Sequence, residues 1–574
     1  MKNVYFLVNN SDFNRQLKKL TRFPIINNLN EIKEKNATLV IFYEAFENKW
    51  FFEQVLTAGT FNHVILIEQS ESGLRVSSFS ANKIGCPKCM DFYEDKLPLS
   101  NKNLLNINIL DEIILKILKV SSNKNFQYVL EISKNMKVNL LKLLPSFFCI
   151  NCKELYRRKF PIHKSTSLKQ EGIRKFNDEM VNNLVLSIPV GDYSLFDSPE
   201  IYQFKEIYIS RVKIKGSYNS YGIGRSFTKE NAVNVSLLES LERLSLNGNI
   251  GTSNNIMKPY KDLTYAIHPS KLIKTNYVFD ESLYYRWVTG LELSTRENVM
   301  IPEQLVLIEN DITLKNKGEN RFYSTTSNGT AIGGSIEEAT FFAIKEYLER
   351  DYGLKAWYLK ENLKRWSLQF FYKNKKIMSL IQFFKENYCD LHIISTSNIK
   401  IITTVWVHLS WKNGQLNSLG SGFSPENAVE SALLELFTGF LNFKKLNQQQ
   451  EQRIYHLNKT NQFENMEDHV LYYLQKKVRG QFSFIKSIPY ENESKYNALE
   501  KWIEEKQSEG LSSLFYSLVE EMKKLDRKIY MVDLTPSILK EIDSNLSVAK
   551  VFMTNSYHFN FGFYDNNHNH HPFL

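Results

Sequence analysis

The sequence predicts an α/β protein in two parts, and three observations indicate this class. In the N-terminal part, apolar runs with the length of strands alternate with helical stretches, as in α/β domains. In the C-terminal part, a glycine-rich turn followed by a helix recurs three times. Four of the five cysteines form two close pairs, both in the N-terminal part. We therefore expect a large C-terminal α/β domain of repeated glycine-turn and helix units, preceded by a smaller α/β domain that its cysteines staple together.

The N-terminal domain is expected over residues 1–160. Its strands are predicted at the apolar runs Val4–Val8, Thr38–Phe42 and His63–Glu68. The pattern of Asn106–Val120 predicts an amphipathic helix. The proline and the Ser/Thr cluster of Phe160–Gln170 are typical of a linker, so the second domain should cover residues 165–574.

The two cysteine pairs read Cys86-Pro-Lys-Cys89 and Cys149-Ile-Asn-Cys152. Each spacing lets two thiolates turn toward one ion, and two such pairs complete the tetrahedral shell of zinc. Unliganded thiols are the alternative. We expect one structural zinc, because a closed four-sulfur shell leaves no open position for catalysis. Cys389 stands alone and is expected to be an ordinary core or surface residue.

Each repeat of the C-terminal part has an alanine, a small residue four positions later and a glutamate three beyond it. This spacing puts the three residues on one face of a helix. Small residues let a backbone or a ligand approach closely, and the glutamate adds charge at that approach. The repeats are Ala232, Ser236 and Glu239, then Ala339, Ala343 and Glu346, then Ala428, Ala432 and Glu435.

The first two repeats end alike, as Glu239-x-x-Glu242-Arg243 and Glu346-x-x-Glu349-Arg350. One such string is usually a solvated helix face, whose charges only tune helix stability. Here the register recurs, and each repeat follows a glycine-rich turn that can aim backbone N–H groups at an anion. Aligned carboxylates and glycine-rich turns suit a nucleoside triphosphate held through magnesium, which prefers oxygen ligands.

These strings resemble the YcaO family, over roughly residues 165–574. The resemblance rests on Ser236-Leu-Leu-Glu239-Ser-Leu-Glu242-Arg243, Ser327-Asn328-Gly329-Thr-Ala331-Ile-Gly333 and Glu346-Tyr-Leu-Glu349-Arg350-Asp351. It implies an ATP-dependent enzyme that activates backbone amides of ribosomal peptides. It implies Mg²⁺ ligands at Glu239, Glu242, Glu346 and Glu349. It also implies further nucleotide contacts at Ser236, Arg243, Glu338 and Arg350.

The chain departs from the family near its C-terminus. A basic residue followed by Pro-Gly is common there, whereas Lys550 is followed by Thr554-Asn555. Family cyclodehydratases tend to end in a proline-rich tail that reaches the active site, and this chain keeps part of it in His570-His571-Pro572-Phe573-Leu574. The resemblance therefore implies a catalytic role for the terminal carboxylate of Leu574. A frayed terminus whose histidines, His568 included, bind metal adventitiously is the alternative.

The N-terminal part carries a second resemblance. The segment leading to Ile84-Gly85-Cys86 looks like the zinc-knuckle region of the ubiquitin-activating-enzyme-like proteins that accompany azoline-forming YcaO enzymes. No Gly-x-Gly-x-x-Gly nucleotide fingerprint occurs in this part. We expect a shortened relative that has lost adenylation and serves as a docking platform.

Composition argues against several other classes. The chain has 574 residues and a formal net charge of +10, but its densest basic run is only Arg157-Arg158-Lys159. Nucleic-acid binding normally shows a clustered basic footprint, so no nucleic-acid partner is expected. The start lacks a signal-peptide core, and no apolar segment is long enough to span a bilayer. A cytoplasmic protein without a membrane partner is expected.

The resemblance predicts an ATP-dependent cyclodehydratase, or heterocyclase, that converts Cys, or Ser and Thr, of a ribosomal precursor peptide into thiazolines or oxazolines. The final product would be a peptide antibiotic such as a bacteriocin or thiopeptide. An ATP-dependent thioamide- or amidine-forming enzyme and a non-catalytic leader-peptide-binding scaffold are the alternatives. The expected partners are a Cys/Ser-rich precursor peptide, a separate leader-binding protein, a flavin-dependent azoline dehydrogenase and a second copy of the chain in a homodimer.

Overall fold

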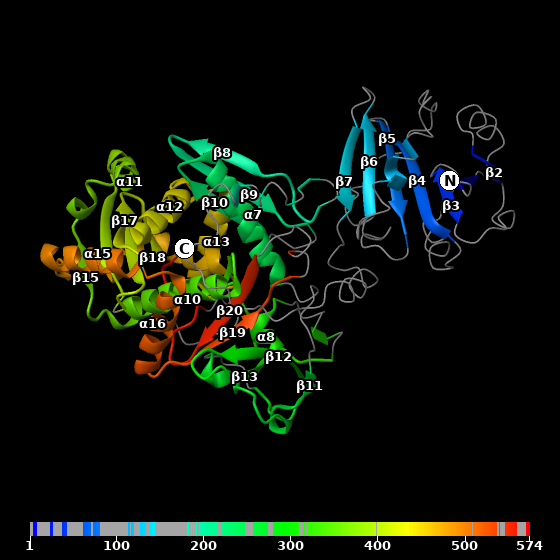
Figure 1. Cartoon of the computed structure of the whole chain (residues 1–574). Helices are drawn as coiled ribbons and strands as arrows, with labels where there is room; N and C mark the ends of the chain where they lie inside the picture. Colours follow the sequence, from blue (N-terminus) through cyan, green and yellow to red (C-terminus); the bar gives the residue numbers. More distant parts are fainter. Residues whose placement is uncertain are drawn as a thin grey trace.

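A computed structural model of the chain describes parts of residues 4–191, most of residues 194–559, and residues 570–573. Within 194–559 the gaps are 216–219, 247–255, 274–278, 309–313, 316–317, 398, 508, 537–538 and 540–545. The described elements form one sheet near the N-terminus and a larger group of sheets and helices beyond residue 194 (Figure 1). The predicted mixed α/β class is confirmed.

A seven-stranded sheet with the order β2-β1-β3-β4-β5-β6-β7 forms the N-terminal region. β1 pairs in parallel with β2 and β3, and β3 with β4, whereas β4 to β7 pair antiparallel. The three predicted strands are present as β1, β3 and β4. The strand bounds are β1 Val4–Leu7, β2 Ile25–Ile26, β3 Ala37–Phe42, β4 Phe61–Ser70, β5 Gly73–Phe79, β6 Gln127–Ser133 and β7 Val138–Leu143.

Other N-terminal predictions fall partly or wholly outside the described residues. Of the predicted helix over Asn106–Val120, residues 113–114 and 116–119 are described and are helical, with Ile113, Ile114 and Ile117 buried. The cysteines Cys86, Cys89, Cys149 and Cys152 and the linker Phe160–Gln170 lie outside the described residues. The zinc site and the domain boundary therefore stay predictions.

The described strands of the C-terminal part form three sheets. A three-stranded sheet has the order β10-β9-β8, with bounds β8 Glu200–Phe204, β9 Ile207–Lys213 and β10 Tyr221–Ser226. A six-stranded sheet runs β11-β12-β19-β20-β14, with β13 also paired to β12, and its bounds are β11 Ile256–Lys258, β12 Tyr285–Glu292, β13 Asn298–Pro302, β14 Thr330–Gly333, β19 Ile529–Asp533 and β20 Ser547–Met553. A four-stranded sheet runs β15-β16-β17-β18, with bounds β15 Lys364–Trp366, β16 Asp390–Ser395, β17 Thr403–Trp411 and β18 Gly414–Gly422.

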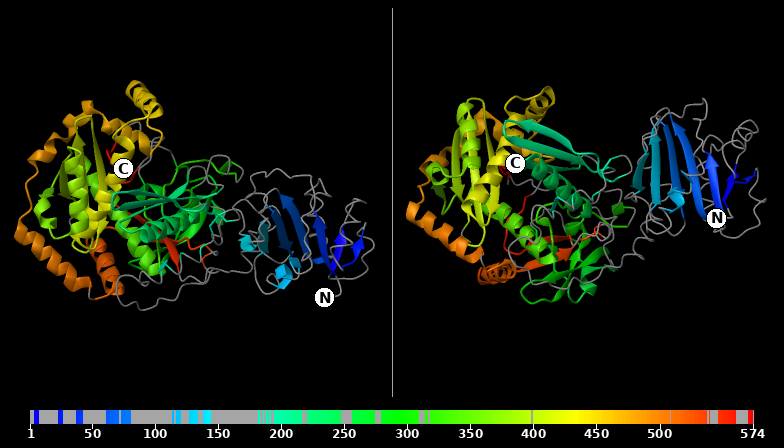
Figure 2. Two further views of the ribbon diagram at one scale, coloured as in Figure 1. Left: turned by 90° about the horizontal axis from the view of Figure 1, so that it is seen from above. Right: turned by 45° about the horizontal axis from the view of Figure 1, so that its top comes forward.

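Three helices, one from each repeat, hold these sheets together. They are α7 (Lys229–Ser245), α10 (Ile336–Leu359) and α12 (Pro425–Phe443). α10 packs on β14 and β20 of one sheet and on β17 and β18 of another, while α7 packs on β9, β10 and β14. Sheets and long helices thus lie together in the C-terminal part, with the N-terminal sheet at one side (Figure 2).

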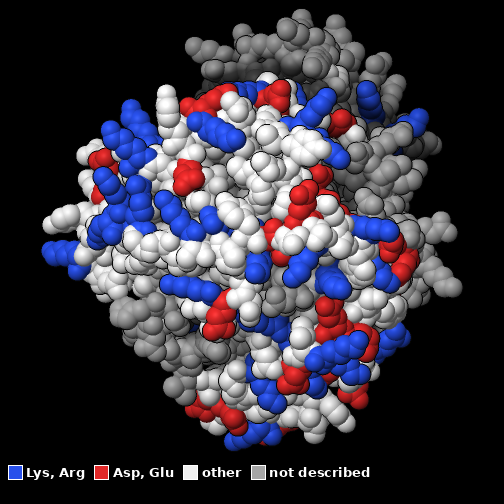
Figure 3. Space-filling model, turned by 90° about the vertical axis from the view of Figure 1, so that its left-hand side faces the viewer, with Lys and Arg blue, Asp and Glu red and all other residues white. Residues whose placement is uncertain are grey.

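Other described helices pack around this centre. Their bounds are α8 Glu303–Val306, α11 Lys375–Glu386, α13 Gln448–Thr460, α14 Met466–Leu474, α15 Glu493–Gln507 and α16 Leu511–Lys524, with a 3₁₀ segment η6 at Lys476–Ser487. Within the described residues, no helix is both long and apolar enough to cross a membrane. On the face shown in Figure 3, basic and acidic side chains are interspersed over most of the surface.

The glycines before each repeat helix are not mainly turn residues, and this part of the prediction is wrong. Gly222 and Gly224 lie within β10, Gly333 ends β14, and Gly420 lies within β18. A Cβ on Gly224 would lie 1.8 Å from the Ala232 carbonyl oxygen, so the glycine lets strand and helix touch. The repeating unit is therefore a glycine-bearing strand packed against the small residues of the next helix.

Each repeat helix begins at a hydroxyl side chain. The side chains of Thr228, Ser335 and Ser424 accept hydrogen bonds from backbone N–H groups three residues later. Such caps satisfy donors that have no partner within the helix, and they set where the helix starts. The sequence predicted that the first-turn N–H groups could bind an anion, but some of these groups are bonded to the caps instead.

Candidate active site

Two of the repeat helices carry the four glutamates that the sequence singled out. Glu239 and Glu242 lie on α7, and Glu346 and Glu349 lie on α10. α7 packs on β14, the strand that leads into α10. The two pairs, far apart in sequence, are close enough that the charge of Glu346 acts on Glu242.

Glu239 is fixed by two donors. The backbone N–H of Ile223 on β10 donates to Glu239 Oε2 at 2.6 Å. Arg243, one turn further along α7, donates from Nη2 to Glu239 Oε1 at 2.7 Å. A carboxylate that receives a backbone N–H and a guanidinium N–H has a defined orientation, because both bonds are charge-assisted.

The surroundings of Glu242 and Glu346 disfavour the charged form of both carboxyl groups. Burial raises the pKa of Glu242 well above its ordinary value, and the charges of Glu346 and Glu239 raise it further. Burial also raises the pKa of Glu346 to about 7, against the opposing charge of Arg350. Two carboxylates whose charges act on each other away from bulk water ionise together only at a cost in free energy, and a bound cation would lower that cost.

Glu349 and Arg350 link α10 to the four-stranded sheet. The Ser421 hydroxyl on β18 donates to Glu349 Oε2 at 2.5 Å, and Arg350 Nε lies 3.6 Å from Glu349 Oε1. Burial opposes the charge on Arg350, but the carboxylates of Glu349, Glu435 and Glu346 outweigh it and raise the arginine pKa. Arg350 therefore sits at the centre of the acidic residues as a permanent cation.

Two further residues belong to this cluster, Glu435 and Lys550, although the sequence analysis did not assign them to the site. Glu435 on α12 is half-buried; removal of its carboxyl from water raises its pKa, while Arg350 and Arg225 oppose that rise. Lys550 on β20 has its pKa lowered to about 7 by burial, against the charges of Glu346 and Glu242. The third repeat already places Glu435 in the register of Glu239 and Glu346, so that signal was present. Lys550 is brought to the cluster only by the pairing of β20 with β14, in which it lies opposite Thr330.

The residue types fit a hard divalent cation. Among the described residues, no three potential ligands are gathered into a ready-made coordination shell. Glu239 is instead bonded to Arg243, and Glu349 to Ser421, while Glu242 and Glu346 are half-buried and the charge of Glu346 disfavours that of Glu242. A set of carboxylates flanked by arginines suits a magnesium ion that is shared with phosphate oxygens rather than held in an all-protein cage.

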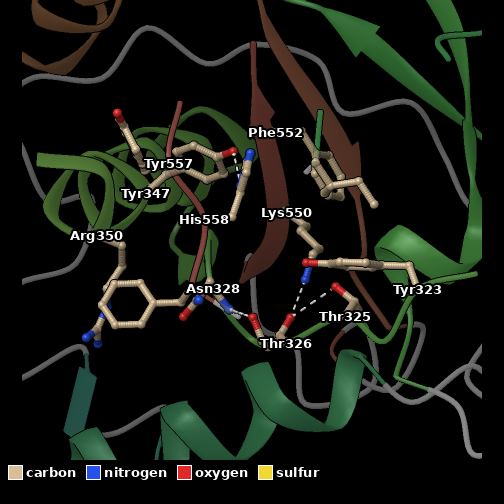
Figure 4. A pocket seen from close by; sticks show the side chains of 12 residues that line it. Tyr323, Thr325, Thr326, Asn328, Tyr347, Arg350, Lys550, Phe552, Tyr557 and His558 are labelled. Atoms are coloured by element: carbon tan, nitrogen blue, oxygen red, sulfur yellow. Dashed lines mark hydrogen bonds between the residues drawn. The ribbon is translucent and has the colours of Figure 1, made fainter. Parts of the chain in front are cut away.

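A small pocket that opens to solvent lies beside this cluster. Arg350 and Lys550 line it and also take part in the acidic cluster (Figure 4). Lys550 Nζ donates to the Thr326 carbonyl oxygen at 2.5 Å, which holds the amine at the pocket wall. The other lining residues are Ile273, Tyr323, Thr325, Thr326, Asn328, Tyr347, Phe552, Tyr557, His558 and Phe559.

Comparison with known families decides the class of this site. Residues 223–555 match the family model described as YcaO cyclodehydratase, ATP- and Mg²⁺-binding. The chain belongs to the YcaO family. Membership confirms the predicted enzyme class, an ATP-dependent YcaO cyclodehydratase, and the matched range includes all four glutamates and Lys550.

Solved structures confirm the fold of the YcaO chain. A heterocyclase determined in complex with substrate and cofactor is similar at a TM-score of 0.69 with 16% identity, over 97% of this chain and 81% of the other. The heterocyclase TruD is similar at a TM-score of 0.59 with 14% identity, over 98% of this chain and 80% of the other. No curated protein sequence matches the chain.

Two of the other predicted nucleotide contacts lie deeper in this YcaO fold. The Ser236 hydroxyl is fully buried, 2.8 Å from the Ser210 hydroxyl of β9, and donates to the Val233 carbonyl oxygen at 2.9 Å. Glu338 lies buried in the first turn of α10, where its N–H donates to the Ser335 hydroxyl. The hydrogen bonds and burial of Ser236 are accounted for by packing alone. A nucleotide contact by Ser236 or Glu338 stays a prediction.

The described part of the C-terminal tail is docked rather than frayed. Phe573 forms a parallel bridge with Asn417 of β18, and its ring packs edge-on against Trp406. The His570 carbonyl oxygen accepts bonds from Trp357 Nε1 at 2.9 Å and from the Tyr473 hydroxyl at 3.1 Å. His571 and Phe573 are fully buried. His568 and Leu574 lie outside the described residues, so the role of the terminal carboxylate stays a prediction.

Proposed function

We propose that the chain converts cysteine residues of a ribosomal precursor peptide into thiazolines, and serine or threonine residues into oxazolines, at the expense of ATP. The observation that supports this most directly is the pair of half-buried carboxylates Glu242 and Glu346, whose charges act on each other beside two basic residues, Arg350 and Lys550. If these residues served only to pack the two helices together, neutral side chains would make the fold more stable, because like charges held away from water are destabilising.

The proposed roles follow from the surroundings of each residue. Glu239, Glu242, Glu346 and Glu349 would hold Mg²⁺ and, through it, the triphosphate. Arg243 orients Glu239, and Arg350 compensates Glu346 and Glu349. ATP supplies the phosphoryl group that turns the amide oxygen into a leaving group. The residues themselves provide positioning and charge neutralisation, which is what phosphoryl transfer mainly requires.

The pocket beside Arg350 and Lys550 is the proposed place of the peptide amide. Its lining combines aromatic rings with a few polar groups, the usual make-up of a ligand site. The Lys550 ammonium, held at the wall by Thr326, can stabilise negative charge that develops on an amide oxygen there. Because its pKa is lowered to about 7 by burial, this stabilisation depends on the nearby carboxylates that favour its charged form.

Further elements of the proposal extend the family resemblance. The N-terminal region, residues 1–160, would be a shortened ubiquitin-activating-enzyme-like docking domain, with zinc held by Cys86, Cys89, Cys149 and Cys152. Residues 165–574 would form the catalytic domain. A leader-binding partner, a flavin-dependent dehydrogenase that oxidises azolines, and a homodimer are also proposed, for a bacteriocin- or thiopeptide-type product.

Mass spectrometry of a cysteine-containing peptide tests the reaction. The enzyme, Mg²⁺ and ATP are incubated with a synthetic peptide that has a Gly-Cys-Gly centre, and with the Glu346→Gln variant as the inactive control. Loss of one water per peptide, coupled to ADP formation, is the expected result. Exchange of oxygen for sulfur with added sulfide would favour a thioamide-forming enzyme. An unchanged peptide with no ATP turnover would favour a non-catalytic scaffold.

A further inference from the structure

A buried serine of the third repeat contacts one of the proposed magnesium ligands. Ser421 lies in β18 with 3% of its surface exposed, and its hydroxyl donates to Glu349 Oε2 at 2.5 Å. Glu349 lies on α10 and is itself only 8% exposed. None of the roles proposed for the acidic cluster includes this serine, although it forms a short hydrogen bond to a buried member of the cluster.

A lysine on the other side of the hydroxyl determines the direction of this hydrogen bond. Lys345 Nζ lies 3.3 Å from Ser421 Oγ and 3.3 Å from the Ser421 carbonyl oxygen. An ammonium group can only donate, so the hydroxyl oxygen accepts from Lys345 and its single proton goes to Glu349. Lys345 and Glu349 lie one turn apart on α10, and a serine from a different element thus bridges them.

The glycines on either side of Ser421 fix the position of its hydroxyl. A Cβ on Gly420 would lie 2.2 Å from the Ala428 carbonyl oxygen, and a Cβ on Gly422 would lie 2.7 Å from the Ala428 nitrogen. β18 can lie this close to α12 only because both residues lack a side chain. Side chains alternate between the two faces of a strand, so Ser421 points to the opposite face, on which β18 packs against α10. The third repeat therefore delivers a hydroxyl to the second.

The hydrogen bond from Ser421 limits how the Glu349 carboxylate can turn. Oε2 is held by the serine, while Oε1 lies 3.6 Å from Nε of Arg350, the cation that also interacts with Glu346 and Glu435. Groups that hold a metal ligand by a hydrogen bond orient that ligand, and their loss typically lowers metal affinity or activity about 10- to 100-fold.

From this geometry we propose that Ser421 is a positioning residue, which keeps Glu349 in the orientation that serves magnesium binding, and that Lys345 fixes the direction of its hydroxyl. The inference rests on the magnesium site of the proposed function. A bond that only held α10 against β18 would contribute to the free energy of unfolding and would leave the binding of Mg²⁺ and nucleotide unchanged. The two roles can therefore be separated by experiment.

The test measures the affinity of the full-length protein for a non-hydrolysable ATP analogue by isothermal titration calorimetry, once with saturating Mg²⁺ and once with EDTA. Ser421→Ala should lower the affinity in Mg²⁺ by about 10- to 100-fold. The affinity in EDTA should not change, because the serine acts through a metal ligand.

Ser418 provides the matched control. It lies in the same strand, is fully buried, and its hydroxyl donates to the Ala432 carbonyl oxygen of α12 at 2.8 Å. Ser418→Ala also removes a buried, hydrogen-bonded hydroxyl from β18, so it should lower the melting temperature about as much as Ser421→Ala does. Its affinity for the analogue in Mg²⁺ should equal that of the wild type.

A double-mutant cycle shows whether the serine acts through the glutamate. In the Glu349→Gln background, Ser421→Ala should have little further effect on the affinity in Mg²⁺, because residues that act as one unit are not additive. Ser421→Cys, which is nearly isosteric and offers only a weak donor, should lower the affinity by a smaller factor and keeps the test open if the alanine variant does not fold.

Wild-type affinity in Mg²⁺ for both Ser421 variants, or an effect that simply adds to that of Glu349→Gln, would overturn the inference. The proposed function would still stand if the wild type forms an azoline from the Gly-Cys-Gly peptide. A wild type whose affinity for the analogue does not depend on Mg²⁺ would remove both the inference and the proposed magnesium site.

Discussion

The glycines of the repeats allow a sharp test of the fold, and Gly224→Ala is the most informative change. A Cβ on this residue of β10 would lie 1.8 Å from the Ala232 carbonyl oxygen and 2.8 Å from both the Ala232 carbonyl carbon and the Ser236 nitrogen. All three are backbone atoms of α7, so no side-chain rotation can relieve the overlap. The strand and the helix must move apart.

The cost has two parts. Overpacking in a close-packed interior typically costs about 1–3 kcal/mol, and a rigid backbone neighbour puts this change at the upper end. Moving β10 away from α7 also stretches the bond from the Ile223 N–H to Glu239, now 2.6 Å, and a hydrogen bond to a charged group contributes about 1.5–3 kcal/mol. We therefore expect a loss of about 3 kcal/mol or more in the free energy of unfolding.

Urea unfolding followed by circular dichroism measures this loss, and Mg²⁺-dependent ATP turnover measures the effect on the site. The matched control is Gly480→Ala in η6, where a new Cβ would meet nothing within 4 Å. That variant should change stability by less than about 1 kcal/mol. If Gly224→Ala were as stable as Gly480→Ala and turned over ATP normally, the close contact between β10 and α7 would be shown to contribute little to stability or to the site.

Three other predictions address the site, the tail and the metal. Burial raises the pKa of Glu346 from 4.5 to about 7, so this residue should make the magnesium-free protein less stable as the pH rises between those values. The stabilisation by Mg²⁺ should grow over the same pH range. Thermal melts of the wild type and of Glu346→Gln check this, and the variant should show neither trend. Deletion of Leu574 alone should lower the cyclisation rate with little change in melting temperature. By contrast, Phe573→Ala should lower the free energy of unfolding by about 3–5 kcal/mol, because the ring is fully buried. An equal cyclisation rate after the Leu574 deletion would refute the catalytic role of the terminal carboxylate. Elemental analysis should find about one zinc per chain, and zinc retained after serine replacement of both Cys149 and Cys152 would exclude the four-cysteine site.

Helix periodicity made the acidic site readable from the chain. Glu239 and Glu242, like Glu346 and Glu349, share a helix face through their spacing alone, and helix geometry is local. The alanines and serines of the repeats likewise marked a face that another backbone approaches. The α/β class and the strands β1, β3 and β4 also followed from local patterns of apolar residues.

The role of the glycines, the residues that complete the site and the place of the tail depended on the tertiary structure. Glycine in a sequence signals freedom of the backbone or close approach, and only strand pairing shows that Gly224 and Gly420 serve close approach to α7 and α12. Lys550 joins Glu346 because β20 pairs with β14, and Phe573 is buried because β18 offers it an edge. Contacts between segments far apart in the chain arise from sheet pairing and packing, which no local spacing encodes. The local pattern therefore determined the charged helix faces of this YcaO protein, and the packing of sheets against them decided which other residues share the site.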